Sequence, residues 1–354
     1  MSRIVGVHGV LPPYRYQQQE IRDAFVEMAA VGPVRRGVLE RMHAASTVRS
    51  RHLAMPLERY AHLGGFGEAN DAYVAVALEL GEAALRGALA DAGVAAGDVD
   101  LVVSTSVTGL AVPSIEARLA GRLGLRADVK RVPIFGLGCV AGAAGLARVH
   151  DYLEGRPDGV AVLLSVELCS LTLQHGDASA ANLVAASLFG DGAAAVVAVG
   201  RGHPAARGER GPETMATRSR LYPGTERLLG WDIGDSGFRI VLGSDLPQTV
   251  LRHLGPEVRE FLADHDLKPA DVEEWICHPG GPKVLEAVRA ALDLPARALE
   301  LTWRSLAEVG NLSSASVLHI LRDTLDRRRP LAGTPGLMLA MGPGFSSELL
   351  LLRW

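Results

Sequence analysis

A strand, a glycine turn and a helix of unusually small residues follow one another in residues 131–148, Arg-Val-Pro-Ile-Phe-Gly-Leu-Gly-Cys-Val-Ala-Gly-Ala-Ala-Gly-Leu-Ala-Arg. Glycine in a helix interior costs about 1 kcal/mol relative to alanine, so Gly142 and Gly145 indicate that larger side chains do not fit. We therefore expect a closely packed central helix. Cys139 stands at its N-terminus, where unpaired backbone N–H groups and the helix dipole stabilise a thiolate. The segment predicts a nucleophilic cysteine.

Two other interpretations of this segment stay open on its residues alone. Cys139 can be an inert small hydrophobe, as most buried cysteines are. Residues 136–141, Gly-Leu-Gly-Cys-Val-Ala, also fit the glycine pattern of a dinucleotide-binding turn, with Glu167 closing the next strand as the ribose ligand. A single match of this kind is weak. Residues elsewhere in the chain are needed to distinguish the nucleophilic cysteine, the inert cysteine and the dinucleotide-binding turn.

Composition excludes several classes of protein. The chain has 354 residues, 48% of them hydrophobic, which is enough for one large or two ordinary domains. A net charge of −4 without a basic cluster argues against nucleic acid as a partner. No run approaches 18 apolar residues and no signal-peptide pattern opens the chain, so we expect no integral membrane segment and a cytoplasmic location. Three cysteines without a C-x-x-C motif, Cys139, Cys169 and Cys277, predict neither disulfides nor a zinc site.

Apolar runs without polar alternation, separated by helical segments, predict an α/β fold whose parallel sheet is covered on both faces. The expected strands are 4–11, 100–106, 159–167, 189–199, 274–278, 336–341 and 347–354, and the expected helices are 15–30, 70–92, 247–264, 281–292 and one opening near Asn311. Residues 200–225 are rich in Gly, Pro and Arg and mark a boundary, which gives an N-terminal half 1–205 and a C-terminal half 206–354. Both halves show the same order of elements, as a duplicated β-α-β-α-β unit would.

Three chemically useful residues fall at strand ends or helix starts. Cys139 follows one strand, His278 ends another before Pro-Gly-Gly-Pro, and Asn311 precedes a run of small residues. Chemistry in open α/β sheets lies beyond the carboxyl ends of the strands, so we expect one shared pocket. Taken singly, His278 is more simply a structural histidine and Asn311 a helix N-cap. Three such coincidences at equivalent positions favour the shared pocket.

The residue types of this set indicate its chemistry. A histidine within hydrogen-bond reach of a cysteine holds it as a thiolate, which attacks a thioester carbonyl and keeps the acyl group. An asparagine amide donates hydrogen bonds without adding negative charge. Asn311 and His278 are therefore suited to stabilising the enolate that a malonyl thioester forms when it loses carbon dioxide. The set predicts acyl transfer followed by carbon–carbon bond formation.

Five motifs spread over nearly the whole chain resemble those of the type III polyketide synthases, the chalcone-synthase-like branch of the thiolase superfamily. They are residues 136–142, 188–194, 278–282, 310–316 and 342–344. The resemblance implies a thiolase-like αβαβα layered fold, a homodimer, and acyl-CoA and malonyl-CoA as substrates, with no cofactor and no metal. It places the catalytic triad on Cys139, His278 and Asn311.

The same resemblance implies a substrate cavity. Its two gatekeeping phenylalanines fall on Phe189 and Phe238, and Leu229 replaces a glycine common in plant members. The full set of expected substrate-binding residues is Phe189, Phe238, Thr108, Cys169, Thr172, Leu229, Ser313, Gly342, Pro343 and Gly344. Val112 stands where plant enzymes send a methionine across the dimer interface, a departure from the family's pattern. Arg49 and Arg51 are either solvated surface residues or contacts for the phosphates of CoA.

Within the family, residues 278–283 and 341–345 resemble bacterial enzymes that make alkylpyrones or alkylresorcinols. This narrower resemblance predicts a medium- or long-chain acyl starter on Cys139, repeated condensation with malonyl-CoA, and cyclisation to a pyrone or resorcinol. Two alternatives remain. The initiating ketoacyl synthase of fatty-acid synthesis also uses Cys, His and Asn, for one condensation on acyl carrier protein. A catalytically silent thiolase-fold subunit would be free to lose its nucleophile, and Cys139 argues against it.

Overall fold

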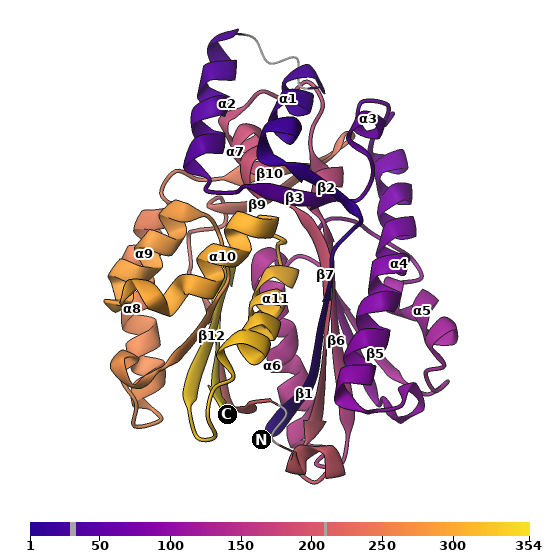
Figure 1. Ribbon diagram of the computed structural model, residues 1–354, viewed down its shortest axis with the longest axis vertical. Helices are drawn as coiled ribbons and strands as arrows, with labels where there is room; N and C mark the ends of the chain where they lie inside the picture. Colours follow the sequence, from indigo (N-terminus) through magenta and orange to yellow (C-terminus); the bar gives the residue numbers. More distant parts are fainter. Residues whose placement is uncertain (29–32, 209–210) are drawn as a thin grey trace.

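Strands from both halves of the chain join in one sheet. In the computed structural model, which describes residues 1–28, 33–208 and 211–354, this sheet has nine strands in the order β11-β12-β13-β8-β1-β7-β6-β4-β5 (Figure 1). The two halves meet at β1 and β8, where Ser2 pairs with Thr214 and Arg3 with Glu213. The strands are β1 (Ser2–Val10), β4 (Leu101–Thr105), β5 (Lys130–Ile134), β6 (Val160–Leu168), β7 (Asp191–Gly200), β8 (Glu213–Leu221), β11 (Glu274–Cys277), β12 (Pro335–Gly342) and β13 (Ser346–Arg353).

The strand pairings show the internal duplication that the sequence predicts. In the N-terminal half β4 is parallel to β6, which is antiparallel to β7, which is antiparallel to β1. In the C-terminal half β11, β12, β13 and β8 repeat the same relations. The prediction of a parallel sheet holds for β4 with β5 and β6 and for β11 with β12, and it is wrong for β1, β7, β8 and β13, which pair antiparallel. A strand buried on both faces has the same continuous apolar pattern whether its neighbours are parallel or antiparallel, so the pattern could not distinguish them.

The helices form three layers around the sheet, as in a thiolase-like αβαβα fold (Figure 1). α6 and α11 lie in the middle, and α6 contacts strands of both halves. α4 and α5 cover the outside of the N-terminal half, and α8 and α9 cover the outside of the C-terminal half. The helices are α1 (Gln18–Met28), α2 (Pro33–Ala45), α3 (Leu57–Tyr60), α4 (Phe66–Ala92), α5 (Ile115–Leu123), α6 (Ala141–Glu154), α7 (Ala180–Leu188), α8 (Leu246–Ala263), α9 (Pro282–Leu292), α10 (Glu300–Val309) and α11 (Ala315–Asp323).

The small residues of α6 are explained by its two neighbours. A Cβ on Gly142 would lie 2.1 Å from the backbone oxygen of Ser314, which immediately precedes α11. A Cβ on Gly145 would lie 2.6 Å from Leu163 Cδ1 on β6. Real Cβ atoms do not approach other atoms so closely, because protein interiors are close-packed. The predicted central helix is confirmed: backbone requires glycine at position 142, and at position 145 a larger residue would displace the Leu163 side chain.

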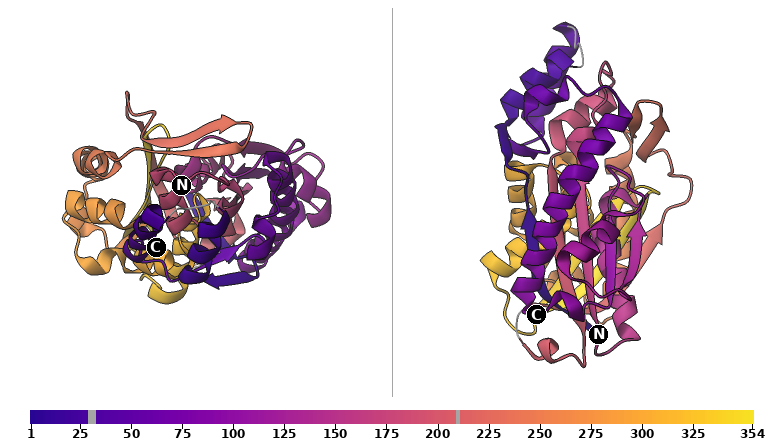
Figure 2. Two further views of the ribbon diagram at one scale, coloured as in Figure 1. Left: turned by 90° about the horizontal axis from the view of Figure 1, so that it is seen from above. Right: turned by 90° about the vertical axis from the view of Figure 1, so that its right-hand side faces the viewer.

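A cap of short elements lies at the end of the molecule away from the two termini. It consists of α1, α2 and α7 together with two two-stranded sheets, β2 (Tyr14–Gln17) with β3 (Ser50–Leu53) and the hairpin of β9 (Leu229–Gly234) with β10 (Gly237–Leu242). The β9–β10 sheet runs along one margin of the molecule, at the top of the left-hand view in Figure 2. Among the helices of the described residues, none combines the length and the apolar character that a membrane span needs.

Several elements differ from the sequence-based expectations. The helix predicted over 15–30 begins as strand β2, and its last two residues lie outside the described part of the chain. The boundary region 200–225 contains strand β8, whose outer end is solvent-exposed and therefore polar. The expected elements also lack α7, α10 and the β9–β10 hairpin, each of which is short.

Substitution of Gly142 by alanine tests the packing of α6. We expect Gly142→Ala to lower the free energy of unfolding by roughly 3 kcal/mol or more, because the new methyl group meets backbone that cannot rotate away. Gly121→Ala is the matched control. Gly121 is exposed in α5 with nothing within 4 Å of its Cβ position, so alanine there should stabilise by about 0.5–1 kcal/mol. Denaturant unfolding of both variants measures the difference, and equal values would contradict the packing argument.

Candidate active site

Cys139 sits in a tight turn that leads into α6. Gly138, directly before it, has φ +56°, and a Cβ there would lie 2.6 Å from the ring of Pro343. A side chain would therefore be both strained and blocked, which explains the glycine. Cys139 is 8% exposed, and its Sγ lies 3.6 Å from the hydroxyl of Ser313. The turn thus fixes the sulfur beside the loop before α11.

Asn311 belongs to the loop that brings the C-terminal half to Cys139. Its backbone forms a bridge with the segment after α7: Asn311 N–H donates to Leu188 O (2.8 Å), and Gly190 N–H donates to Asn311 O (3.0 Å). The side-chain oxygen accepts the N–H of Ser313 at 2.8 Å, which fixes the amide so that its NH2 group is the end left to donate. The N-cap interpretation is wrong, because α11 begins at Ala315 with Ser314 as its cap.

His278 follows β11 and is held by the sheet rather than by its side chain. Its backbone N–H donates to Leu339 O on β12 at 2.8 Å. The imidazole is 3% exposed, and neither ring nitrogen has a hydrogen-bond partner among the described residues. Burial lowers the pKa of His278 to about 3, so the ring is neutral at pH 7. A purely structural histidine would be expected to have its ring nitrogens hydrogen-bonded. The unpartnered nitrogens of His278 are better explained by a hydrogen bond that forms when a ligand binds.

Burial opposes a thiolate at Cys139. It raises the pKa of the thiol to about 12, and hydrogen bonds with Ser313 and Asn311 act in the opposite direction. The cause is desolvation, which penalises a charge in this enclosed turn. The expectation that His278 holds the cysteine as a thiolate stays a prediction, since neither ring nitrogen of His278 has a hydrogen-bond partner among the described residues.

Glu167 stands behind the cysteine and is fully buried. It accepts hydrogen bonds from Val107 N–H (3.1 Å), from the Thr108 hydroxyl (2.9 Å) and from the Ser314 hydroxyl. Burial raises its pKa to about 7 in spite of these bonds. The prediction of Glu167 as a ribose ligand is wrong, because both of its oxygens are already engaged inside the protein. The dinucleotide interpretation fails with it.

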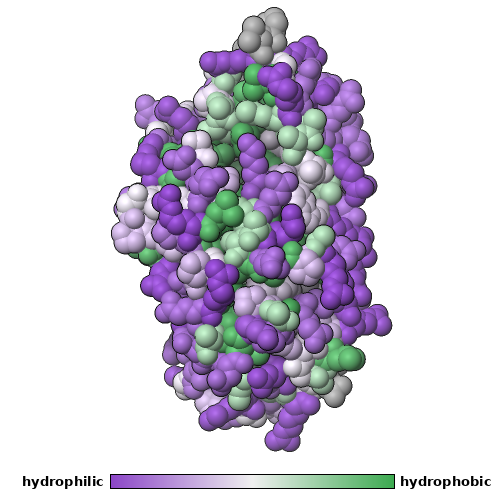
Figure 3. Space-filling view, turned by 90° about the vertical axis from the view of Figure 1, so that its left-hand side faces the viewer, coloured by the Kyte–Doolittle hydropathy of each residue, from purple (hydrophilic) through white to green (hydrophobic). Residues whose placement is uncertain are grey.

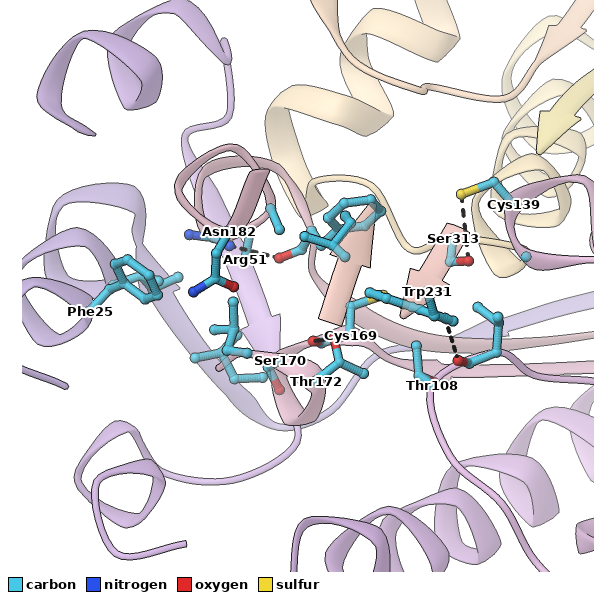
Figure 4. Close-up of a pocket in the computed structure, with 18 of the residues that line it drawn as sticks. Phe25, Arg51, Thr108, Cys139, Cys169, Ser170, Thr172, Asn182, Trp231 and Ser313 are labelled. Carbon is cyan, nitrogen blue, oxygen red and sulfur yellow. Dashed lines mark hydrogen bonds between the residues drawn. The ribbon is translucent and has the colours of Figure 1, made fainter. Parts of the chain in front are cut away.

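An elongated, narrow cavity begins at Cys139, and the space in it that the centre of a water molecule can occupy is about 50 Å³. Figure 4 shows Cys139 and Ser313 at one end and Phe25 at the other, with Arg51 and Asn182 between them. Of the predicted substrate-binding residues, the wall contains Thr108, Cys169, Thr172, Phe189, Leu229, Ser313 and Pro343. These side chains come from both halves of the chain, and the cavity is the space between them.

Three other predicted residues lie beside this wall. Phe238 lines a neighbouring hollow, where its ring packs edge-on against Phe66 with centroids 5.2 Å apart. Gly342 lets the loop after β12 approach the cysteine turn, since a Cβ there would lie 2.7 Å from Leu137 O. Gly344 follows Pro343 with φ +137°, a conformation that favours glycine. The two glycines therefore shape the loop that carries Pro343.

Sequence reasoning missed part of the wall. Trp231 lines the cavity and donates its indole N–H to Val107 O at 3.0 Å. Ile21, Phe25 and Met28 line the far end from α1. Their spacing in the sequence is typical of a buried helix face, but it does not say that the face borders a cavity.

The two arginines have different surroundings. Arg49 has 69% of its side chain exposed and lies 3.9 Å from Glu308. Arg51 is only 1% exposed, so its prediction as a surface contact for CoA is wrong. It lies on β3, which turns its side chain inward against α1 and α7, where Nη1 donates to Phe189 O at 2.7 Å. In the described part of the chain, no cluster of three or more His, Cys, Asp or Glu side chains is placed to hold a metal ion.

The layered fold, with a cysteine at the buried start of its central helix, defines an acyl-transferring enzyme of the thiolase class. Comparison with known proteins narrows this class. Residues 2–202 match the family model for the N-terminal domain of chalcone and stilbene synthases, and residues 213–354 match the model for their C-terminal domain. The chain therefore belongs to the chalcone and stilbene synthase family. It is a type III polyketide synthase, an enzyme that joins acyl units from CoA thioesters by decarboxylative Claisen condensation.

Individual relatives agree with the family match. A 1,3,6,8-tetrahydroxynaphthalene synthase of Streptomyces peucetius subsp. caesius is 59% identical over 353 residues, which cover 100% of this chain and 93% of the relative. A phloroglucinol synthase of Pseudomonas fluorescens is 30% identical and covers 100% of this chain and 99% of its own. The crystal structure of 1,3,6,8-tetrahydroxynaphthalene synthase from Streptomyces coelicolor A3(2) has a TM-score of 0.93 at 31% identity, over 99% of each chain. These relatives favour neither the initiating ketoacyl synthase nor a silent subunit.

Replacing Glu167 by glutamine tests the buried carboxyl. In the folded state its pKa is about 7, above the ordinary 4.5, so the folded state binds more protons between these values and its stability falls as the pH rises through them. Glu167→Gln lacks this titration. We expect the free energy of unfolding of the wild type, relative to the variant, to drop by about 2–3 kcal/mol from pH 5 to pH 8. Urea unfolding at several pH values measures it, and parallel pH curves would contradict the raised pKa.

Proposed function

We propose that this enzyme condenses malonyl-CoA units on Cys139 into a pentaketide, which it cyclises to an aromatic polyol of the tetrahydroxynaphthalene type. The observation that carries the proposal is the relative with this product in its name, 59% identical across the whole chain. A naphthalene skeleton has ten carbons, the content of five two-carbon units. Malonyl-CoA would therefore serve as both starter and extender.

The chemistry of the side chains gives each member of the proposed triad a role. Neutral His278 accepts the proton of the Cys139 thiol as the sulfur attacks the starter thioester, and CoA leaves as its thiol with that proton. The acyl group is then held on Sγ. Proton removal coupled to attack suits a thiol whose pKa burial has raised to about 12. No stable thiolate is needed before the substrate arrives.

Asn311 serves the second step. Malonyl-CoA loses carbon dioxide, and the negative charge that develops on the thioester oxygen is stabilised by the Asn311 amide together with His278. The resulting carbanion attacks the acyl group on Cys139, the new carbon–carbon bond forms, and the cysteine sulfur leaves. The lengthened chain is then a CoA thioester, which Cys139 attacks again with release of CoA, and each further round adds two carbons. The proposal needs no cofactor other than the CoA thioesters, and the exposed Arg49 is available for their phosphates. Three unpaired cysteines suit a reducing compartment such as the cytoplasm.

A second candidate function is the extension of a medium- or long-chain acyl starter to alkylpyrones or alkylresorcinols. The observation that favours it is the apolar far end of the cavity, where Ile21, Phe25 and Met28 surround space that an alkyl tail would fill. The names of the relatives point instead to products built without such a tail. The starter therefore separates the two candidates.

We also propose a homodimer that forms through the side of the molecule where β5 is the edge strand. Val112 is 94% exposed, and Leu110, Val132 and Phe135 are each more than 40% exposed. Exposed apolar residues gathered beside an unpaired strand mark an interaction surface. The face over α8 and α9 has a different character, since hydrophilic residues cover most of it and hydrophobic ones form small groups (Figure 3).

Product analysis tests the proposed function. Purified enzyme given malonyl-CoA alone should release a ten-carbon aromatic product, identified by mass spectrometry, and Cys139→Ala should reduce it at least about 1,000-fold because the covalent intermediate is lost. Cys277→Ala, another buried cysteine outside the cavity, is the matched control and should keep the product. Octanoyl- and palmitoyl-CoA are then added. Products formed only when such a starter is present would reject the malonyl-primed pentaketide in favour of the second candidate.

A charge on the β5 side tests the dimer. We expect Val132→Glu to shift the protein to a monomer in sedimentation velocity, because an unpaired carboxylate would be buried in the interface. Leu331→Glu is the control, since Leu331 is 81% exposed in a loop of the C-terminal half. It should sediment like the wild type. A dimer that survives Val132→Glu unchanged would place the interface elsewhere.

A further inference from the structure

Arg51 brings a charged donor to the wall of an otherwise largely apolar cavity. Its side chain is fully buried, and two of its three nitrogens are bonded: Nε donates to Gln18 Oε1 at 3.0 Å and Nη1 to Phe189 O at 2.7 Å. The third, Nη2, has no hydrogen-bond partner among the described residues. A buried donor left unpaired is unfavourable, and more so when it is charged. The presence of an unpaired, charged donor at this position indicates that Arg51 binds a ligand.

The position of Arg51 fits a contact with a long substrate. In Figure 4 the guanidinium lies well away from Cys139 on the way to Phe25, next to Asn182. A chain attached to Cys139 that grew along the cavity would therefore pass it. The surrounding wall at this end includes Ile21 and Leu173, which offer no oxygen to the guanidinium. The polar wall residues, Asn182 among them, make no hydrogen bond to Nη2, so a substrate oxygen that reaches this nitrogen would be its first partner.

The charge of Arg51 is balanced without using Nη2. Burial lowers its pKa to about 10, and the attraction of Asp191 opposes that fall, so the guanidinium stays protonated at neutral pH. The Asp191 carboxylate itself accepts from Ala54 N–H (2.6 Å), from Ser170 N–H (2.8 Å) and from the Ser170 hydroxyl. The protein thus supplies the counter-charge and leaves both N–H groups of Nη2 without a partner among the described residues. Nη2 is itself buried, so a substrate oxygen reaches it only when the chain displaces part of the cavity wall, and there a charge-assisted hydrogen bond in a low-dielectric setting is strong.

We propose that Arg51 is a specificity-determining residue, whose Nη2 donates a hydrogen bond to an oxygen of the chain carried on Cys139. This inference rests on the proposed function. The oxygen has two possible sources with the same acceptor chemistry: the free carboxylate of a malonyl starter, or a ketone of the growing polyketide. A hydrogen bond to either oxygen would favour an oxygen-bearing chain over an alkyl chain of the same length, because an alkyl chain would leave Nη2 unpaired.

A purely structural role for Arg51 is the competing explanation. The hydrogen bonds from Nε and Nη1 connect β3 to α1 and to the residue after α7. These bonds do not depend on whether a substrate occupies the cavity. A second protein group, His43, is also buried without a hydrogen-bond partner among the described residues, and Arg51 helps to keep its pKa low, at about 3. If His43 were the acceptor for Nη2 through an intervening water, substrate choice would depend on His43 as much as on Arg51. Both alternatives predict results that differ from ours.

The test is a competition between starters. Wild type, Arg51→Met, Arg51→Lys, Gln18→Met and His43→Leu are each given malonyl-CoA with and without hexanoyl-CoA, and mass spectrometry measures the ratio of malonyl-primed to hexanoyl-primed products. We expect the ratio to fall at least tenfold in Arg51→Met, and to fall in Arg51→Lys, which keeps the charge but loses the planar fork. Gln18→Met and His43→Leu should lower the melting temperature and leave the ratio as in the wild type. A ratio does not depend on how much of each variant is folded.

The length of the products separates the two oxygen sources. If the ketone of the growing chain is the ligand, hexanoyl-primed products of Arg51→Met become shorter than those of the wild type; if the malonyl carboxylate is the ligand, their length stays and only the starter ratio changes. Unchanged ratio and unchanged length in both Arg51 variants would overturn the inference and leave Arg51 a structural residue. Equal effects of His43→Leu would overturn it in favour of the internal acceptor. Failure of the wild type to convert malonyl-CoA alone would reject the proposed function, while product length from hexanoyl-CoA would still decide the role of Arg51.

Discussion

Close packing between the two halves of the chain is the constraint on which the rest of the structure depends. α6 can lie in the middle only because Gly142 leaves room for the backbone at Ser314 and Gly145 leaves room for β6. This approach brings the loop before α11 to the start of α6, so that Ser313 comes within 3.6 Å of the Cys139 sulfur. The reactive group and the residues around it are therefore placed by helix packing, and the position of the sulfur does not rely on a flexible loop.

Burial also sets the electrostatics of the site. Desolvation raises the pKa of Cys139 and lowers that of His278, so burial favours the neutral form of each. Burial also raises the pKa of Glu167 to about 7, although three donors surround it. Such a site gains little from charges that exist before the substrate binds. Its donors and acceptors are instead arranged for charge that appears during the reaction, when an enclosed environment makes each hydrogen bond stronger.

The sequence predicts the fold class, the central helix and the neighbourhood of Cys139 and Asn311, because each is encoded locally: small residues, glycine turns and continuous apolar strands. The surroundings of Arg51 could not be predicted in this way. Two arginines separated by one residue look alike in the chain, and only the docking of α1 and α7 over β3 buries one of them. The same holds for Phe25 and Trp231, whose apolar character predicts burial but not the cavity beside them. The missing information is tertiary, since it depends on which empty space the packing leaves.

The proposed triad has a consequence for how the two halves evolved. Cys139 comes from the first half, and His278 and Asn311 come from the second, although both halves repeat the same order of strands. Under the proposed roles, one copy of the duplicated unit would have kept the position for covalent attachment, and the other the positions that handle protons and negative charge. Neither copy would then need to be an enzyme by itself. The corresponding position that is unused in each half would be free to change, and an enzyme with two different halves would arise from two equal ones.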